Sequence, residues 1–297
     1  MVNTKNSNTI GTKEKKYNLK NDIIFKIFFS RKGNEEFLIN FLNAILKIEI
    51  QKIEIRNEVS LEQLDPSEKG GRLDLQATLN DGIIVNIELQ IENKHNIEGR
   101  TTFYSAKVIS METERGTEYK DINQVVMINI LDYEMFDFEE YISETAIVLD
   151  KHREYEVLKG IKWYFIELPK FRKMHPDMND KVNQWLAFID DYDKGMIKMA
   201  EEKNPTLKKA RGEMEYLTGD EAVKRLAFLR EKWEMDRVSD INHAKREGKA
   251  EGIRKGKTEG KIEKQKEIAK EMLKRKMPIE LISEITKLPK EEIEKLK

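Results

Sequence analysis

The sequence predicts an α/β fold in which a mixed β-sheet is flanked by helices and followed by a helical C-terminal region. Two observations carry this prediction. In the first 170 residues, stretches with an apolar residue at every second position, typical of half-buried strands, are interleaved with stretches of helical periodicity. Beyond residue 170 the apolar residues recur only at helical spacing. Helices and strands in this order favour a mixed sheet covered by helices.

Two helices are expected before the first strand. The first begins just after Lys20, where Asn21 or Asp22 is available as its N-cap because either side chain can accept a backbone N–H. The second is expected over residues 34–46, which carry an apolar stripe at helical spacing. Alternating residues 48–59 then predict a strand that leads into a hairpin.

The hairpin, formed by residues 71–79 and 83–91, is the most informative segment of the chain. The odd-numbered positions of both stretches are apolar, and the connection Asn80-Asp81-Gly82 fits a three-residue loop that ends in a left-handed glycine. This loop length predicts a register in which Leu75 faces Ile87. A slip by one residue would move every apolar side chain to the other face of the sheet, so the register is strongly specified.

The same register places Asp74 directly opposite Glu88 on the polar face, and Gln90 follows next along that face. Two adjacent like charges destabilise a sheet unless a positive charge lies between them. A pair of carboxylates at this spacing suits Mg²⁺ or Mn²⁺. The alternative is that a chain with 37% charged residues places an Asp opposite a Glu on a solvated face by chance.

A further helix is expected over residues 97–116, and it places Arg100, Tyr104 and Lys107 on one face. Three more strands are expected, at residues 123–131, 145–150 and 163–168. The core domain is therefore expected to span residues 17–170, after a disordered leader of residues 1–16.

The remainder of the chain is expected to contain a helical extension at residues 171–247, a glycine repeat at 248–261 and a small helical tail at 262–297. The glycines of the repeat stand at every fourth position, and each costs about 1 kcal/mol in a helix interior, so the repeat predicts a linker or a weak helix. Two prolines break the tail into short pieces. Their spacing is compatible with a helix-turn-helix-like unit and equally with an interaction bundle.

Composition narrows the class of protein. The chain has no cysteine, which excludes disulfide scaffolds and cysteine-based zinc sites. It lacks an apolar run long enough for a signal peptide or a membrane span, so we expect a cytoplasmic protein without a membrane partner. Residues 208–297 carry 25 lysines and arginines against 19 acidic residues, although the whole chain has a net charge of −1. This C-terminal region is expected to face a polyanion, a second copy of the chain as a homo-oligomer, or solvent alone.

Several short segments together resemble one known family. They are Asn21-Asp22-Ile23-Ile24-Phe25, Leu73-Asp74-Leu75, Glu88-Leu89-Gln90, and Arg100 with Tyr104. In order and spacing they are similar to the Rpn-type recombination-promoting nucleases, which are transposase-like members of the PD-(D/E)XK nuclease superfamily. The resemblance covers most of residues 17–297. It implies a restriction-endonuclease-like core and Mg²⁺-dependent (or Mn²⁺-dependent) cleavage of DNA in recombination, mobile-element transfer or defence against foreign DNA.

The resemblance also implies roles for particular residues. Asp74 and Glu88 match the metal-binding carboxylates of the family, and Gln90 matches the last position of its Glu-x-Gln variant. Asp22 matches an acidic position on the first helix that completes the metal site, although it could serve only as a helix cap. The three catalytic residues implied are therefore Asp74, Glu88 and Gln90, with Asp74, Glu88 and Asp22 as metal ligands.

Gln90 is the one departure from the superfamily pattern, because the usual residue there is a lysine that stabilises the charged transition state. Lys94 and Lys107 are candidates to supply the missing charge. Arg100 could instead hold a phosphate group, and Tyr104 could hydrogen-bond a carboxylate.

Two other classes of function stay open on the sequence alone. One is a catalytically weak protein that retains the nuclease fold and binds nucleic acid or oligomerises. The other is a helical scaffold with a purely structural α/β domain. The discriminating feature is whether the acidic and amide groups converge in space.

Overall fold

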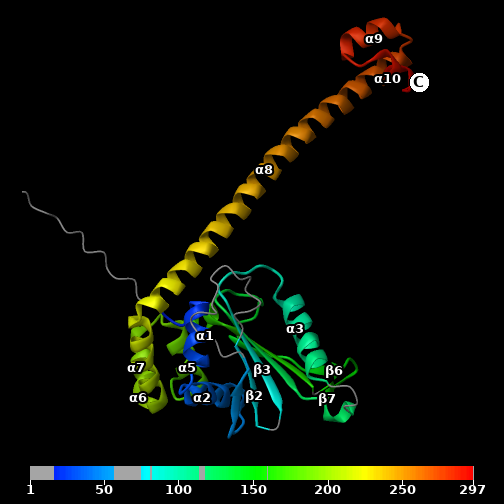
Figure 1. Ribbon diagram of the computed structural model, residues 1–297. Helices are drawn as coiled ribbons and strands as arrows, with labels where there is room; N and C mark the ends of the chain where they lie inside the picture. The colour runs from blue at the N-terminus through cyan, green and yellow to red at the C-terminus, as the bar shows by residue number, and fades with distance from the viewer. Residues whose placement is uncertain (1–16, 57–74, 81, 114–117, 159, 297) are drawn as a thin grey trace, which may run out of the picture. The chain divides into compact units, whose positions relative to one another are not determined.

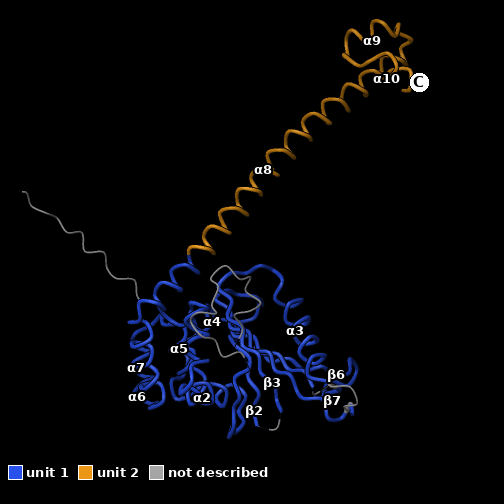
Figure 2. The backbone as a smooth tube through the Cα atoms, in the orientation of Figure 1, with its two compact units in different colours: residues 1–231 blue, residues 232–297 orange. Residues whose placement is uncertain are grey.

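The computed structural model describes residues 17–56, 75–80, 82–113, 118–158 and 160–296. The chain forms two compact units, which divide between Glu231 and Lys232 (Figure 2). The predicted leader of residues 1–16 and the predicted metal ligand Asp74 lie outside the described residues.

A six-stranded mixed sheet forms the centre of the first unit, which confirms the predicted α/β fold (Figure 1). The strand order is β1 (Ile53–Ile55), β2 (Leu75–Leu79), β3 (Ile83–Gln90), β4 (Val125–Leu131), β8 (Ile161–Glu167) and β5 (Ile142–Glu144). Strands β3, β4 and β8 run parallel, and the outer pairings are antiparallel. Two further strands, β6 (Ile147–Leu149) and β7 (His152–Leu158), form a separate two-stranded sheet.

The predicted register of the hairpin is confirmed in its described part. Leu75 pairs with Ile87, and the pairing continues in step to the loop. At the loop, Gly82 has a φ of +111°, and a Cβ there would lie 2.4 Å from Oδ1 of Asn123. The positive φ favours glycine at this position, and any larger residue would also displace the Asn123 side chain. The short loop therefore holds β2 and β3 in the one register that puts all their apolar side chains on one face.

Two of the predicted strands differ from the structure. The described part of the segment predicted over 48–59 is a strand only at β1, because the Asn80 side chain accepts the backbone N–H groups of Gln51 and Lys52 in place of a neighbouring strand. The strand predicted over 145–150 is the shorter β6, which pairs with β7 in the separate sheet, whereas β5 lies just before the predicted range and joins the six-stranded sheet. Strand β7 was not predicted, because its sequence is mostly polar and its residues are largely exposed.

Helices cover both faces of the sheet (Figure 1). The apolar side chains of α1 (Asp22–Ser30) and α2 (Glu35–Leu46) share one core cluster with Leu75, Val85 and Ile87. On the other face, Tyr104 of α3 (Ile97–Glu112) packs in a cluster with Ile84. Because β3 residues alternate between faces, its even-numbered side chains lie on the α3 side.

The helices that follow the sheet belong to the same compact unit, which extends to residue 231. They are α4 (Leu168–Lys173), α5 (Lys181–Asp190), α6 (Lys194–Lys203) and α7 (Pro205–Gly219). Trp185 of α5 is fully buried, and its Nε1 donates to Asn40 Oδ1 on α2 at 2.8 Å. Burial of such apolar surface against α1 and α2 joins these helices to the sheet domain.

Within the predicted helical extension, the helix breaks between α5 and α6. Asp191 ends α5 with a φ of +50°, and the Asp193 side chain accepts the N–H groups of Gly195 and Met196 to begin α6. This Asp-Tyr-Asp segment offers the backbone local hydrogen bonds that compete with a continuous helix.

The long helix α8 (Glu221–Lys274) begins in the first unit and continues into the second, where α9 (Ile279–Thr286) and α10 (Lys290–Glu294) follow. Ala269, Ile282, Leu288 and Ile293 form the small core of the second unit. The four repeat glycines lie within α8, and a Cβ added at any of them would meet nothing within 4 Å. Among the described helices, none is long and apolar enough to cross a membrane.

The glycine repeat gives the first testable prediction. Replacement of Gly248, Gly252, Gly256 and Gly260 by alanine should stabilise this part of α8 by about 1 kcal/mol per site, since alanine loses less backbone entropy and meets open space. The ellipticity at 222 nm during a thermal scan should therefore fall at a higher temperature than in the wild type. Ala250→Gly should shift the scan in the opposite direction. An unchanged scan for both variants would contradict a continuous α8.

Candidate active site

Asn86, Glu88 and Gln90 of β3 form a polar row at the α3 side of the sheet. Asn86 and Glu88 are 6% and 4% exposed, and Gln90 ends the strand half-buried. In the neighbouring strand β4, Asn129 pairs with Glu88 and is fully buried. A central strand that carries a buried carboxylate needs specific partners for it, because an isolated charge is costly to bury.

Glu88 is the centre of these contacts. Gln90 Nε2 donates to Glu88 Oε1 at 2.6 Å, and Arg100 Nη2 from α3 donates to the same oxygen in an ion pair. The other carboxylate oxygen, Oε2, is buried and has no hydrogen-bond partner among the described residues. The structure thus brings together Glu88, Gln90 and Arg100, and it leaves one hard oxygen of Glu88 available to a further ligand.

Helix α3 is held against the sheet by polar contacts close to Arg100. Thr101 Oγ1 donates to Asn129 Oδ1 at 3.2 Å, and Trp163 Nε1 of β8 donates to Ser105 Oγ at 2.9 Å. Thr101 directly follows Arg100, and Ser105 lies about one turn further along α3. These contacts fix the rotation and position of α3, and thereby place Arg100 where its side chain can contact Glu88.

The remaining predicted residues of this helix face are placed differently. The Arg100 guanidinium lies 5.3 Å from the ring centroid of Tyr104, whose ring packs in the apolar cluster of α3. Tyr104 thus supports Arg100 through its ring. Lys94 and Lys107 are both exposed, whereas Glu88 is held by Gln90 and Arg100. Lys107 lies on the same face of α3 as Arg100 but about two turns further along the helix, and its side chain is exposed.

Tyr133 joins the site although sequence periodicity does not identify it. Its hydroxyl donates to Gln90 Oε1 at 3.2 Å, so the Gln90 amide is held at both ends. Burial, reinforced by the negative charge of Glu88, raises the pKa of Tyr133 to about 12, which keeps the hydroxyl protonated. The signal that could have found it is its place two residues beyond β4, since the carboxyl ends of parallel strands meet at one edge of a sheet.

A second buried ion pair lies at the same edge. Glu167, at the end of β8, is fully buried and accepts from Lys170 Nζ at 2.8 Å. It also accepts the backbone N–H groups of Met135 and Phe136, which fixes the segment that follows Tyr133. The charge of Glu167 adds to the rise in the pKa of Tyr133. The carboxylates of Glu88 and Glu167, each paired with a basic residue, therefore both favour the protonated form of Tyr133.

No described contact joins Asp22 to this group. It begins α1, whose apolar side chains pack on the face of the sheet opposite to α3. Its Oδ2 accepts from Arg230 Nε at 2.9 Å and forms an ion pair with Arg230 Nη2 at 2.8 Å. Asn21, the other candidate, is the N-cap, and its side chain accepts Ile24 N–H. The contacts of Asp22 thus connect α1 with α8.

The chemistry of the donors at Glu88 fits a hard divalent cation. A carboxylate oxygen without a partner and an amide oxygen are the ligand types that Mg²⁺ and Mn²⁺ prefer. Within the described ranges, however, no group of three or more His, Cys, Asp or Glu side chains gathers. Glu88 is therefore the single described carboxylate of this row, and a metal ion there requires a further ligand.

The raised pKa of Tyr133 gives a prediction for the pH dependence. The difference between the 295 nm titrations of the wild type and Tyr133→Phe should have its midpoint near pH 12. Because the ordinary value is 10.0, the stabilisation by the protonated hydroxyl is present below pH 10 and is lost as the pH rises from 10 to about 12. A midpoint at the ordinary value would contradict the burial of this hydroxyl.

Comparison with known proteins agrees with this geometry. A family model described as PD-(D/E)XK nuclease family transposase matches residues 19–244, which include the whole sheet, α1 to α7 and the start of α8. No curated protein and no solved structure matches the chain. The matched region covers most of the chain and contains Glu88, Gln90 and Arg100 together with Asp74. The chain belongs to the PD-(D/E)XK nuclease family of transposase-like proteins, as its sequence resemblance predicted.

Proposed function

We propose that this protein is a metal-dependent DNA endonuclease that hydrolyses phosphodiester bonds with Mg²⁺ or Mn²⁺. The observation that carries the proposal is the buried Glu88 carboxylate, which has one oxygen held by Gln90 and Arg100 and the other without a described partner. A metal-dependent nuclease needs a carboxylate oxygen that can bind the metal ion, and the second oxygen of Glu88 is a candidate. The family membership supports the same reaction class.

Asp74 and Glu88 are the metal ligands in this proposal. The support for Asp74 is the register of the described hairpin, in which Leu75 pairs with Ile87, because one further step of the same pairing matches position 74 with position 88. A bound divalent cation would polarise the phosphate and lower the pKa of an attacking water. Asp74 would complete the donor set that Glu88 begins.

In this proposal Gln90 positions a water molecule, and Arg100 stabilises the negative charge that develops on the phosphate. Gln90 is fixed by Glu88 and Tyr133, so its amide can hold a water molecule in one orientation with the lone pair that Tyr133 does not use. Arg100 supplies the fixed positive charge that the superfamily usually obtains from a lysine at position 90. Its guanidinium can donate to a phosphate oxygen as negative charge develops.

The metal role of Asp22 stays a prediction. Arg230, which is 4% exposed, holds its carboxylate, and a second metal ion would have to compete with that ion pair. The proposal therefore requires only Asp74 and Glu88 as carboxylate ligands.

The first test is the cleavage of supercoiled plasmid. With Mg²⁺ or Mn²⁺ the wild type should nick the plasmid, and Asp74→Ala and Glu88→Gln should each lower the rate by about 100-fold or more, because the metal ion loses a ligand. Glu98→Gln is the matched control, since Glu98 is exposed on the first turn of α3. Chelation of the metal should stop cleavage.

Equal nicking by Glu88→Gln and the wild type would refute the proposed active site. Absence of nicking by the wild type with retained DNA binding would favour the alternative of a nucleic-acid-binding protein that keeps the nuclease fold.

The second test concerns the charge of Arg100. Arg100→Gln should slow cleavage by roughly 100-fold, whereas Arg100→Lys should stay within about tenfold of the wild type because it keeps a positive charge near Glu88. Urea denaturation should show that Arg100→Gln is destabilised by about 3 kcal/mol, since it leaves a buried carboxylate without its cation. Equal rates for both variants, at equal stability, would show that the charge of Arg100 has no role in cleavage.

A further inference from the structure

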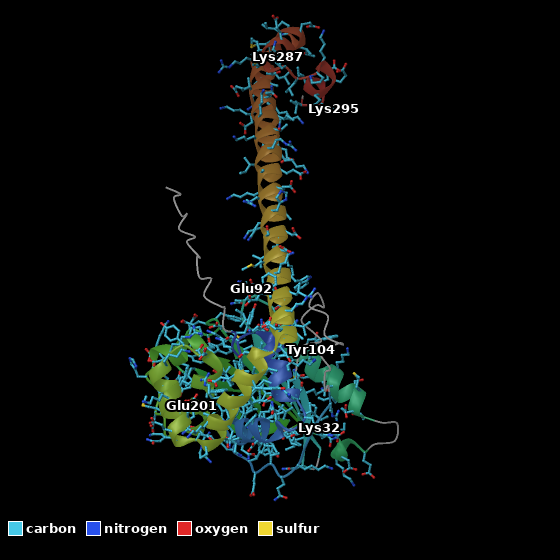
Figure 3. All side chains as sticks on the ribbon, turned by 60° about the vertical axis from the view of Figure 1, so that its left-hand side comes forward. Lys32, Glu92, Tyr104, Glu201, Lys287 and Lys295 are labelled. Atoms are coloured by element: carbon cyan, nitrogen blue, oxygen red, sulfur yellow. The ribbon has the colours of Figure 1, made fainter. Side chains whose placement is uncertain are left out.

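Residues 239–264 of α8, which include the glycine repeat, are exposed, and their side chains radiate from the helix (Figure 3). At 3.6 residues per turn, six cationic residues of this stretch fall within an arc of about 140°. We name them the basic face: Arg246, Lys249, Arg254, Lys257, Lys261 and Lys264.

The acidic residues of the same stretch lie on the other side of the helix. Asp240, Glu247, Glu251, Glu259 and Glu263 fall within the opposite arc of about 160°. Two of them already have a basic partner, since Glu251 pairs with Lys255 at 2.8 Å and Glu247 lies 3.5 Å from His243. Within the described part of the chain, no residue of the basic face forms an ion pair. The segregation leaves one side of α8 with uncompensated positive charge.

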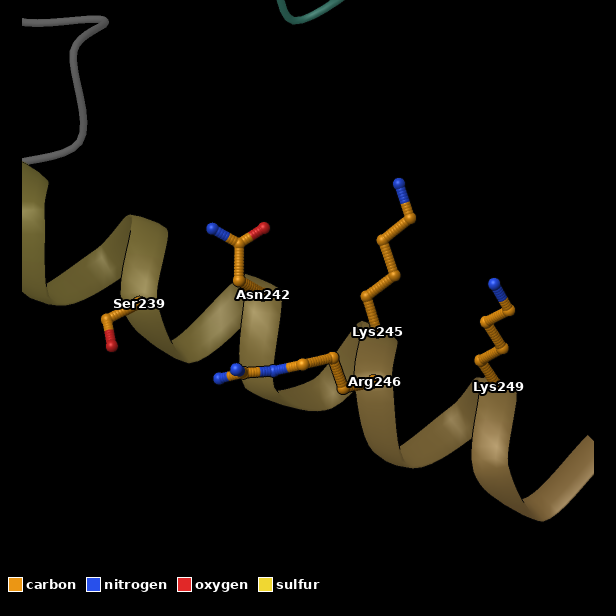
Figure 4. A pocket seen from close by; sticks show the side chains of 5 residues that line it. All are labelled: Ser239, Asn242, Lys245, Arg246 and Lys249. Carbon is orange, nitrogen blue, oxygen red and sulfur yellow. The ribbon is translucent and has the colours of Figure 1, made fainter.

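A hollow of about 450 Å³ lies at the start of the basic face (Figure 4). Its described lining consists of Ser239, Asn242, Lys245, Arg246 and Lys249. Asn242, Lys245 and Lys249 point to the same side of the helix (Figure 4). Hydroxyl and amide groups beside lysine and arginine are the donors that bind phosphate oxygens in protein–DNA contacts.

The composition of this helix argues against an anionic membrane as the partner. A helix that lies on a membrane needs an apolar face opposite its cationic one. Here that side is acidic, and the three isoleucines of the stretch, Ile241, Ile253 and Ile262, are isolated from one another among polar and charged residues. The charge pattern complements a ligand that presents phosphates in series without an apolar layer.

We propose that the basic face of α8 binds the phosphate backbone of duplex DNA. From Arg246 to Lys264 the face extends over about 27 Å, which exceeds the ~12 Å width of the major groove and lets it contact phosphates of both strands. Gly256 and Gly260 border or lie within the face, and the absence of a Cβ allows the backbone to approach the DNA closely. The inference rests on the proposed function, in that DNA is the substrate.

The test uses the full chain and a 30-base-pair DNA duplex, with fluorescence anisotropy in the presence of a chelator so that binding is measured without cleavage. The face variant carries Arg246→Gln, Lys249→Gln and Lys257→Gln. The matched control carries Lys255→Gln, Lys266→Gln and Lys270→Gln, which remove the same charge from the other sides of α8. Circular dichroism should show that both variants keep the helix.

The face variant should bind at least tenfold more weakly than the wild type at 100 mM salt. Its slope of log K against log salt should fall by about 2.7, which is 0.9 for each phosphate that the variant no longer neutralises, and the control should change by less than one. Equal loss of DNA affinity in the two variants, or no loss in either, would overturn the inference. Plasmid nicking by the wild type would uphold the proposed function even in that case. Weaker binding by the face variant alone, without any nicking by the wild type, would uphold the basic face and refute the nuclease.

Two other probes identify the partner. An RNA duplex of the same sequence and vesicles of anionic phospholipid should bind more weakly than the DNA, with little difference between the face variant and the control. A preference for either probe that the face variant abolishes would overturn the assignment to DNA.

Discussion

The structure around the candidate site depends on the burial of one carboxylate, that of Glu88 in a central strand. A charge in that position must have a cationic partner, and Arg100 can provide it only if α3 lies at one particular rotation against the sheet. The buried hydrogen bond between Thr101 and Asn129 holds that rotation. A buried glutamate in β3 therefore requires Arg100 and Thr101 in α3 and Asn129 in β4.

The same constraint gives a physical reason for the departure at Gln90. A lysine at this position would place a second cation beside the carboxylate that Arg100 already neutralises. A neutral amide can instead donate to Glu88 and accept from Tyr133 without adding charge. The neighbouring Glu167 is neutralised independently by Lys170. The charges at this edge of the sheet are thus balanced pair by pair.

Much of the fold followed from local pattern. The β2–β3 register was predicted correctly because strand periodicity and loop length are both local properties, and together they allow one alignment. The central strands and the first helices were also predicted, since their apolar periods are regular. The break at Asp191 and the mostly polar strand β7 were not, because capping and pairing with a distant segment compete there with periodicity.

For the site, the sequence by itself determined that Glu88 and Gln90 share the polar face of one strand, since side chains alternate along any strand. Only the tertiary structure decided that Arg100, and neither Lys94 nor Lys107, reaches Glu88, because the docking of α3 sets which turn of the helix lies beside Glu88. Likewise, Tyr133 meets Gln90 through the convergence of parallel strand ends, and Asp22 meets Arg230 from 208 residues away. Contacts at such separations depend on how the elements pack, and no local period in the sequence encodes them.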